Sequence, residues 1–260
     1  MNVNNFLLGI IMGIANLLPG ISGGTIAVIS GRYEVILKSA SDIVSFNWKK
    51  DSVKTILLLI LGMGFSIVLL SKVLSLIFSK YPEYSYGVFT GLIVGGLIYL
   101  VKRVNLKNIG NVSIITISFL ITYMLLKFAQ NFEISNLNVS TWYLVFGGII
   151  SAATMVLPGI SGSSMLLIMG IYKPVIDAIS VMNLKILIPL GIGVIIGLVL
   201  IIKLLERLIK KYREKVLAFL IGLTISGTII IFPITQKWLT YIYFLIGAFL
   251  SRYLEKILNE

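Results

Sequence analysis

The chain has 260 residues, of which 58% are hydrophobic and only 12% are charged, and its mean hydropathy is +1.02. A soluble domain could not cover so much apolar surface with so few charges, so the net charge of +12 indicates membrane topology rather than a nucleic-acid binder. Cysteine and histidine are both absent, which excludes disulfides, thiol nucleophiles, histidine-containing metal sites and imidazole-dependent triads.

The first predicted element is an apolar stretch over 6–39 that is interrupted at its middle by Pro19 and Gly20. As one helix it would be about 50 Å long, whereas the hydrocarbon core of a bilayer is about 30 Å thick. Proline removes a backbone donor, and glycine tolerates unusual backbone angles. We therefore expect a re-entrant hairpin of two half-helices, with its tip at 19–24.

Further apolar stretches follow in chain order, each long enough to cross a bilayer. Three ordinary spans are predicted at 54–79, 86–103 and 111–130. A second broken stretch covers 142–179, with Pro158 and Gly159 at its middle, and it precedes spans at 186–204, 215–233 and 238–257. The glycine-rich segments 91–96 and 191–197 indicate helix contacts rather than nucleotide loops, because no strand precedes them and no Walker lysine follows.

The two broken stretches belong to an internal repeat. The sequence Leu-Pro-Gly-Ile-Ser-Gly of 18–23 returns at 157–162. A second block matches downstream, where Lys80, Tyr81 and Glu83 correspond to Lys211, Tyr212 and Glu214. Two ordered blocks predict two related halves, which we place at 1–138 and 139–260. Each half contains one broken stretch and three spans.

Three crossings in each half require the second half to be inverted relative to the first. Counting from a cytoplasmic N-terminus places both termini on the inner side, with fifteen basic residues there and six outside, apart from Arg32, which we take as membrane-embedded. This bias follows the positive-inside rule. Full crossing by each broken stretch would make the repeats parallel, and the charges alone do not exclude that arrangement. We expect an all-α polytopic membrane protein of two inverted repeats, each a re-entrant hairpin plus three transmembrane helices.

The tips of the predicted hairpins have chemistry suited to an anion. At each tip a helix begins beside serine, threonine and glycine, so free N–H groups and the positive end of the helix dipole point at the site. Phosphate binds such helix starts without a side-chain cation. The predicted substrate-binding residues at the tips are Asn16, Pro19, Gly20, Ser22, Gly23, Gly24, Thr25, Pro158, Gly159, Ser161, Gly162, Ser163 and Ser164.

Small residues at these positions are also typical of close helix packing, and serine and threonine are typical helix caps. The duplication of the motif at the centre of an overlong stretch favours binding. Two further candidates are Arg32, as a bidentate phosphate ligand, and Glu34, as the acceptor of a coupling proton. Lys173 and Asp177 occupy the corresponding limb of the second hairpin and are expected near the membrane surface. No cofactor or metal is expected.

The paired motifs, Asn-Leu-Leu-Pro-Gly-Ile-Ser-Gly-Gly-Thr at 16–25 with Gly-Arg-Tyr-Glu at 31–34 and Pro-Gly-Ile-Ser-Gly at 158–162 with Gly-Ile-Tyr at 170–172, resemble the bacterial polyprenyl-phosphate transporter (PopT) family. The resemblance covers nearly the whole chain. It implies a flippase of the bacterial cytoplasmic membrane that returns undecaprenyl phosphate, the lipid carrier of cell-wall synthesis, to the cytoplasmic leaflet. The second copy has Ile171 and Lys173 in place of Arg32 and Glu34, so the two hairpins have different roles.

Two other functions remain open at this point. The motif also resembles that of integral-membrane undecaprenyl-pyrophosphate phosphatases, but Gly23 and Gly162 stand at the position of their tip arginine and no Glu-x-x-x-Glu pair is present. The chain therefore lacks the arginine and the paired carboxylates that such a phosphatase would use, and we expect a transporter rather than an enzyme. A small-anion transporter is the other alternative. An opening wide enough for a prenyl tail would favour the lipid, and a closed aqueous vestibule would favour the small anion.

Overall fold

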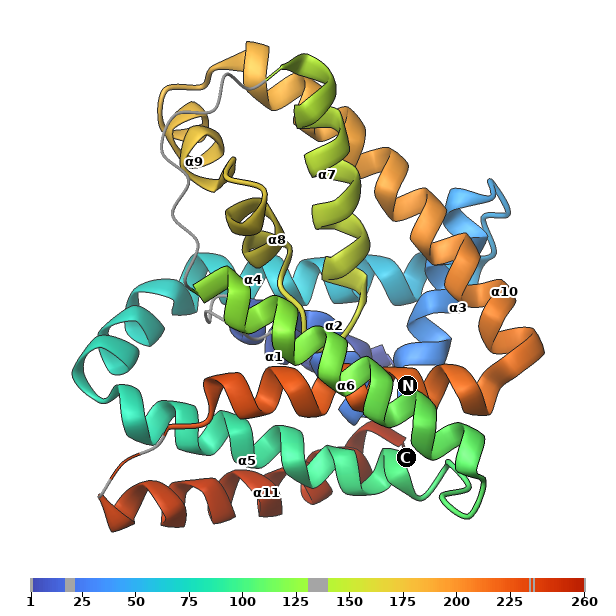
Figure 1. Cartoon of the computed structure of the whole chain (residues 1–260), viewed down its shortest axis with the longest axis vertical. Helices are drawn as coiled ribbons and strands as arrows, with labels where there is room; N and C mark the ends of the chain where they lie inside the picture. The colour runs from blue at the N-terminus through green and yellow to red at the C-terminus, as the bar shows by residue number, and fades with distance from the viewer. Residues whose placement is uncertain (1, 17–21, 131–139, 234, 236, 260) are drawn as a thin grey trace.

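The structure is a computed structural model that describes residues 2–259 except 17–21, 131–139, 234 and 236. All regular structure within these residues is helical (Figure 1). The helices are α1 (Asn2–Asn16), α2 (Gly23–Ile29), α3 (Tyr33–Val44), α4 (Lys50–Lys80), α5 (Pro82–Val101), α6 (Ile109–Gln130), α7 (Thr141–Val156), α8 (Gly162–Ile168), α9 (Tyr172–Ser180), α10 (Leu184–Ile231) and α11 (Trp238–Asn259). The predicted all-α class is thus confirmed, while the predicted boundary between the halves at 138 and 139 includes residues outside the described part.

The ordinary spans lie close to their predicted positions. The helices α4, α6 and α10 are long and apolar enough to cross a bilayer, and the pair α8 and α9, bent by 118°, counts as a fourth candidate among the described residues. The predicted spans 186–204 and 215–233 are two arms of α10 that meet at a kink, and the residues between these spans are helical as well. The helical backbone of α10 is interrupted only at Tyr212, where φ is −135° and ψ is 44°.

The broken stretches contain more helices than expected. We predicted two half-helices in each hairpin, but the limb after each tip is itself divided, into α2 and α3 in the first half and into α8 and α9 in the second. Gly31 and Gly170 form the divisions with φ of 72° and 70°, in the left-handed region that residues with a side chain avoid. The short limb therefore turns sideways after seven residues instead of running straight out.

Positions that the sequence repeat pairs have matching backbone conformations. Tyr81, between α4 and α5, has φ −134° and ψ 56°, close to the angles of Tyr212 within α10. Ser22 and Ser161 are both extended N-caps, with φ of −118° and −98°. The backbone therefore has similar angles at two pairs of positions that the sequence repeat matches. In Figure 1 the bend between α4 and α5 lies at the left edge, and the bend of α10 lies at the right edge.

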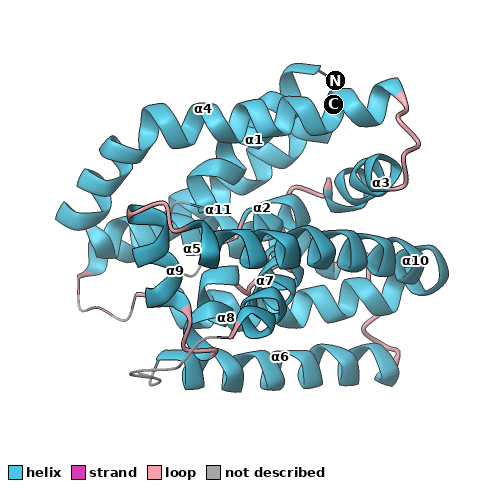
Figure 2. Cartoon of the chain, turned by 90° about the horizontal axis from the view of Figure 1, so that it is seen from above, coloured by secondary structure: helices cyan, strands magenta, loops and turns pink. Residues whose placement is uncertain are grey.

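Helices pack in pairs through glycines that leave no room for a side chain. α1 lies along α4 at one side of the molecule, as Figure 2 shows, and a Cβ on Gly62 would come within 2.3 Å of the Phe6 carbonyl oxygen. A Cβ on Gly91 in α5 would lie 2.0 Å from the carbonyl oxygen of Phe244 in α11. A Cβ on Gly193 in α10 would lie equally close to the carbonyl oxygen of Val145 in α7. This confirms the interpretation of the two glycine-rich segments as helix contacts.

Candidate substrate-binding site

The two broken segments meet inside the molecule. The backbone N–H of Gly159 donates a hydrogen bond of 2.9 Å to Oγ1 of Thr25, and the Ser22 hydroxyl donates one of 3.5 Å to the Leu157 carbonyl oxygen. Thr25 is 2% exposed and Ser22 is 6% exposed. Pro19 and Gly20 lie outside the described residues. The residues on either side of the two breaks are thus joined by buried polar contacts between the halves of the chain.

The N-terminus of α2 is capped by the side chains of Asn16 and Ser22. Asn16, the last residue of α1, accepts a hydrogen bond of 2.6 Å from the Gly23 N–H through its side-chain oxygen. Oγ of Ser22 accepts from the Thr25 N–H at 3.3 Å. Our expectation of four free N–H groups at the first tip is therefore wrong for Gly23 and Thr25. The physical reason is that a buried N–H group requires a hydrogen-bond acceptor, and the side-chain oxygens of Asn16 and Ser22 are the nearest acceptors.

The start of α8 is less completely capped. Ser161 is its N-cap but makes no capping hydrogen bond with its side chain, and its Oγ lies 2.6 Å from that of Ser163 instead. Ser163 is exposed and Ser164 is half-buried. Gly159 has φ 79°, and a Cβ there would meet the Leu223 carbonyl oxygen at 2.1 Å, so the break at Pro158 requires glycine. Gly162 is buried against Ser151 and Met155.

A cavity of about 220 Å³ adjoins the contact between the breaks. Asn16, Gly23 and Gly24 line one part of it, and Tyr33 contributes a phenol. Most of the other lining side chains are apolar and come from α1, α3, α4, α7 and α10, including three methionines, Met12, Met63 and Met155. The cavity therefore combines a polar corner beside the first break with an apolar wall that opens to the surface.

Arg32 and Glu34 lie away from this corner. Both follow α2, whose seven residues separate them from Ser22 by about 10 Å. Arg32 donates a hydrogen bond of 2.9 Å to the Asn5 side chain in α1. The Glu34 carboxylate pairs with the Arg213 guanidinium at 2.7–2.9 Å through both oxygens. The Arg32 guanidinium thus contacts α1, and the Glu34 carboxylate contacts α10.

Lys173 and Asp177 are exposed in α9, and their place near the membrane surface stays a prediction. No group of three acidic residues within the described ranges could hold a metal ion.

Comparison with known proteins identifies the family. The sequence matches the family model described as undecaprenyl phosphate translocase-like over residues 12–243. The chain belongs to this family. It is 30% identical over 244 residues to the polyprenyl-phosphate transporter of Vibrio cholerae serotype O1, covering 89% of this chain and 78% of that protein. It is also 30% identical over 275 residues to the polyprenyl-phosphate transporter of Staphylococcus aureus, covering 98% and 97%. No solved structure matches the chain significantly.

The family match confirms the resemblance seen in the paired motifs and identifies the chain as a multi-pass membrane transporter rather than an enzyme. Two side chains at the site were missed by our sequence reasoning. Tyr33 donates a hydrogen bond of 3.2 Å to the Val156 carbonyl oxygen, next to the second break; its match with Tyr172 in the repeat was an available signal. Arg213 was counted only among the basic residues of the predicted inner side, and no local signal could link it to Glu34, 179 residues away.

For this member of the undecaprenyl phosphate translocase-like family, the arrangement offers hydroxyl and amide groups beside an apolar cavity. Such a site suits a headgroup that accepts hydrogen bonds and is attached to an apolar chain. The described residues at the breaks, including Gly23 and Gly162, carry no guanidinium and no pair of carboxylates. They are suited to binding more than to hydrolysis.

Proposed function

We propose that the chain is a flippase that moves undecaprenyl phosphate across the bacterial cytoplasmic membrane and returns it to the cytoplasmic leaflet. The family match over residues 12–243 supports the choice of substrate. The hydrogen bond between Gly159 and Thr25, which joins the two breaks, is the observation that supports a binding site between them. An apolar cavity open to the surface supports a lipid rather than a small anion, which would need an aqueous vestibule.

The phosphate lies between the two breaks in this proposal, and the prenyl tail remains in apolar surroundings. Asn16, Gly24 and Ser22 contribute from the first break; the hydroxyls of Ser161 and Ser163 contribute from the less completely capped second break. Arg32, about 10 Å along α2, holds the headgroup at a separate position on the way in or out. Glu34 is the candidate for a coupling proton and is held in an ion pair with Arg213.

We also propose that the two halves are inverted repeats. The matching backbone angles at Tyr81 and Tyr212 and at Gly31 and Gly170 support this. The packing supports it too: α5 lies against α11 of the other half, and α6 lies against the last part of α10. Rocking of such halves would expose a site at their meeting point alternately to the two faces.

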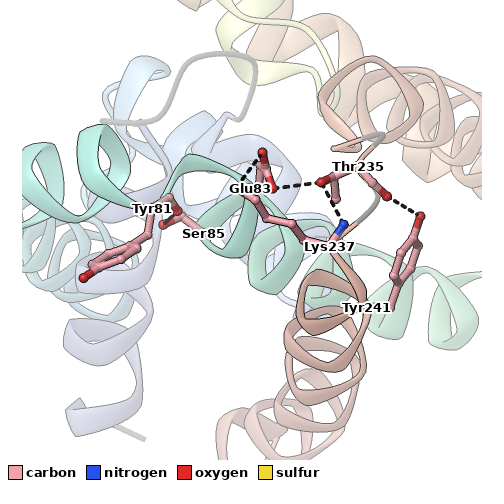
Figure 3. A network of polar contacts seen from close by, with 6 residues as sticks. All are labelled: Tyr81, Glu83, Ser85, Thr235, Lys237 and Tyr241. Carbon is pink, nitrogen blue, oxygen red and sulfur yellow. Dashed lines mark hydrogen bonds and ion pairs between the residues drawn. The ribbon is translucent and has the colours of Figure 1, made fainter.

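The polar contacts between distant segments support the proposed grouping of the loops on two sides of the membrane. Three of them join segments that we predict on the inner side: Glu34 with Arg213, Ser41 with Glu206, and Glu214 with Asn105 and Asn111. Another set joins segments predicted outside. In Figure 3 the Glu83 carboxylate points toward Thr235 and Lys237 across the gap between α5 and the start of α11. None of these contacts joins an inner to an outer segment.

Reconstitution in liposomes tests the function directly. Undecaprenyl phosphate with a leaflet-specific reporter is followed with and without a pH gradient, and we expect accelerated movement in liposomes that contain the protein. Dependence on the gradient would support proton coupling. Movement no faster than in empty liposomes would contradict the proposal.

The phosphatase alternative has its own assay. Purified protein is incubated with undecaprenyl pyrophosphate, and released phosphate is measured. We expect no turnover. Clear turnover that is abolished in Ser22→Ala would overturn the choice of a transporter.

A further inference from the structure

A larger cavity, whose lining residues differ from those of the cavity beside α2, lies at the bend of α10. Its volume is about 510 Å³, within the range of about 300–1,000 Å³ that is usual for ligand sites. Leucines such as Leu204 and Leu208 line it before the bend, and Val216 and Phe219 line it after the bend. The interruption at Tyr212 turns the two parts of α10 toward each other, so one helix supplies most of the wall.

The rim of this cavity is aromatic and basic. Tyr212 and Lys215 line it, and the Nζ atoms of Lys211 and Lys215 lie 5.1 and 5.5 Å from the centre of the Tyr212 ring. The nearby acidic groups are engaged elsewhere. Glu214 accepts a hydrogen bond from Asn111, and Glu206 is paired with Lys210. The ammonium groups of Lys211 and Lys215 therefore both lie close to the Tyr212 ring, beside an apolar cavity.

The cavity reaches the contact between the breaks. Leu157 lines it, and the carbonyl oxygen of the same residue accepts the hydrogen bond from Ser22. The wall of this cavity and the contact between the breaks therefore share one residue.

The corresponding bend between α4 and α5 has only part of this rim. Lys80 lies over Tyr81 at 5.5 Å, as Lys211 lies over Tyr212. The repeat places Tyr84 where the second half has Lys215, and Tyr84 stacks on Tyr81. The second cation is thus specific to the α10 bend.

We propose that the α10 bend is a holding site for polyprenyl phosphate, separate from the site between the breaks. The first isoprene units fill the apolar cavity, and the phosphate lies beside Lys211 and Lys215. A phosphomonoester carries a charge of about −1.5 to −2 at neutral pH, which two lysines match better than they match the single charge of a phosphodiester phospholipid. This inference rests on the proposed function, because it takes the same lipid as the occupant.

Photolabelling of the purified full chain in lipid nanodiscs tests the holding site. The probe is a polyprenyl phosphate with a photoreactive group in its first isoprene units, and labelled peptides are mapped by mass spectrometry. We expect labelling within 201–219. Unlabelled undecaprenyl phosphate should compete, whereas phosphatidylglycerol and undecaprenol should compete much less. Equal competition by phosphatidylglycerol would identify an ordinary lipid contact and overturn the inference.

Matched variants separate the roles of charge and cavity. Lys215→Gln should weaken competition by undecaprenyl phosphate about fivefold, the effect of one lysine near an anionic lipid, while the exposed Lys102→Gln should not. Leu204→Trp fills the cavity from an exposed position and should abolish labelling, while Ile195→Trp, exposed on the same helix outside the cavity, should leave it unchanged. Normal labelling of Leu204→Trp together with unchanged competition in Lys215→Gln would also overturn the inference.

The liposome assay distinguishes this inference from the proposed function. If the wild-type chain moves no undecaprenyl phosphate, the proposed function fails. If it does, but the α10 bend is not labelled, only the holding site fails. Correct folding of Leu204→Trp is checked by its unfolding temperature. If Leu204→Trp is unstable, the competition measured with Lys215→Gln tests the holding site instead.

Discussion

Gly159 donates its backbone N–H to the hydroxyl of Thr25 at 2.9 Å, across 134 residues of chain. Thr25 is buried, and its hydroxyl also lies 3.1 Å from that of Ser22. The same threonine therefore stabilises the first break locally and connects it to the second. Any relative movement of the two halves that separates the breaks must exchange this hydrogen bond for another partner.

Thr25→Val should destabilise the protein. The substitution leaves the Gly159 N–H buried without its acceptor, at a cost of about 1–3 kcal/mol in the free energy of unfolding. Thermal unfolding in one detergent, followed by circular dichroism, measures the effect. Thr25→Ser keeps the hydroxyl and should lie close to wild type. If the valine and serine variants unfold at the same temperature, the hydrogen bond contributes nothing.

Gly24→Ala should push the two breaks apart. A Cβ at this position would lie 2.9 Å from the Val156 carbonyl oxygen, a backbone atom that cannot turn aside. Overpacking of this kind costs about 1–3 kcal/mol, and transport in liposomes should fall with it. Gly64→Ala is the matched control, because no atom lies within 4 Å of its Cβ. Equal transport by the two variants would contradict the close contact proposed at the site.

Arg32→Ala should weaken binding of the phosphate headgroup more than Lys173→Ala does. A charge-assisted hydrogen bond contributes about 1.5–3 kcal/mol, so the loss should be about tenfold or more in affinity for polyprenyl phosphate. Since Arg32 also bonds to Asn5, Asn5→Ala controls for the lost contact while keeping the cation. Binding is measured by competition with a labelled lipid. Equal effects of the alanine variants at 32 and 173 would show the assignment of Arg32 to be wrong.

The ion pair of Glu34 and Arg213 should contribute modestly to stability. Their side chains are 30% and 53% exposed, and exposed pairs contribute about 0.2–1 kcal/mol. A double-mutant cycle with Glu34→Gln and Arg213→Gln gives the coupling energy, which should shrink at high salt. Arg213→Lys should lose most of it, because lysine cannot reproduce the two-pronged contact. A coupling of zero at low salt would mean that the pair does not form in solution.

The stabilising contact of the Glu83 carboxylate with Thr235 and Lys237 should be lost at acidic pH. A hydrogen bond from Thr235, together with Lys237, holds the pKa of the Glu83 carboxyl below its ordinary value of 4.5. The contact therefore stabilises the native state above that value, and this contribution disappears as the pH falls through the lowered pKa. Unfolding temperatures measured from pH about 7 down to about 3 should fall less steeply for Glu83→Gln than for wild type. Asp51→Asn, which changes an exposed carboxylate of α4, should keep the wild-type slope.

Hydropathy alone predicted helices whose bounds in the structure agree to within a few residues. The prediction of 54–79 compares with Lys50–Lys80 in the structure, and 111–130 compares with Ile109–Gln130. The agreement has a local cause, because the length of an apolar stretch and the polar residues at its ends are properties of adjacent residues. The helical backbone across 205–214 was missed for the same reason: its basic residues resemble a loop, although lysine, arginine and glutamate are good helix formers.

The site was only partly predictable. Asn16 and Ser22 were predicted to bind substrate, which stays a prediction, and their use as caps that occupy the amides of Gly23 and Thr25 was not expected. A sequence shows which groups can donate and accept. It does not show which of them satisfy one another, because that depends on how distant segments are brought together in the fold.

The sequence by itself determined that this chain belongs in a membrane and that its two halves carry the same Pro-Gly-Ile-Ser-Gly break, because hydropathy and repetition are written along the chain. Only the tertiary structure decided that the residues flanking the breaks touch each other, that Glu34 meets Arg213, and that α10 folds an apolar cavity under two lysines. These relationships join residues that are distant in the sequence, and they depend on how closely the glycine-lined helices pack.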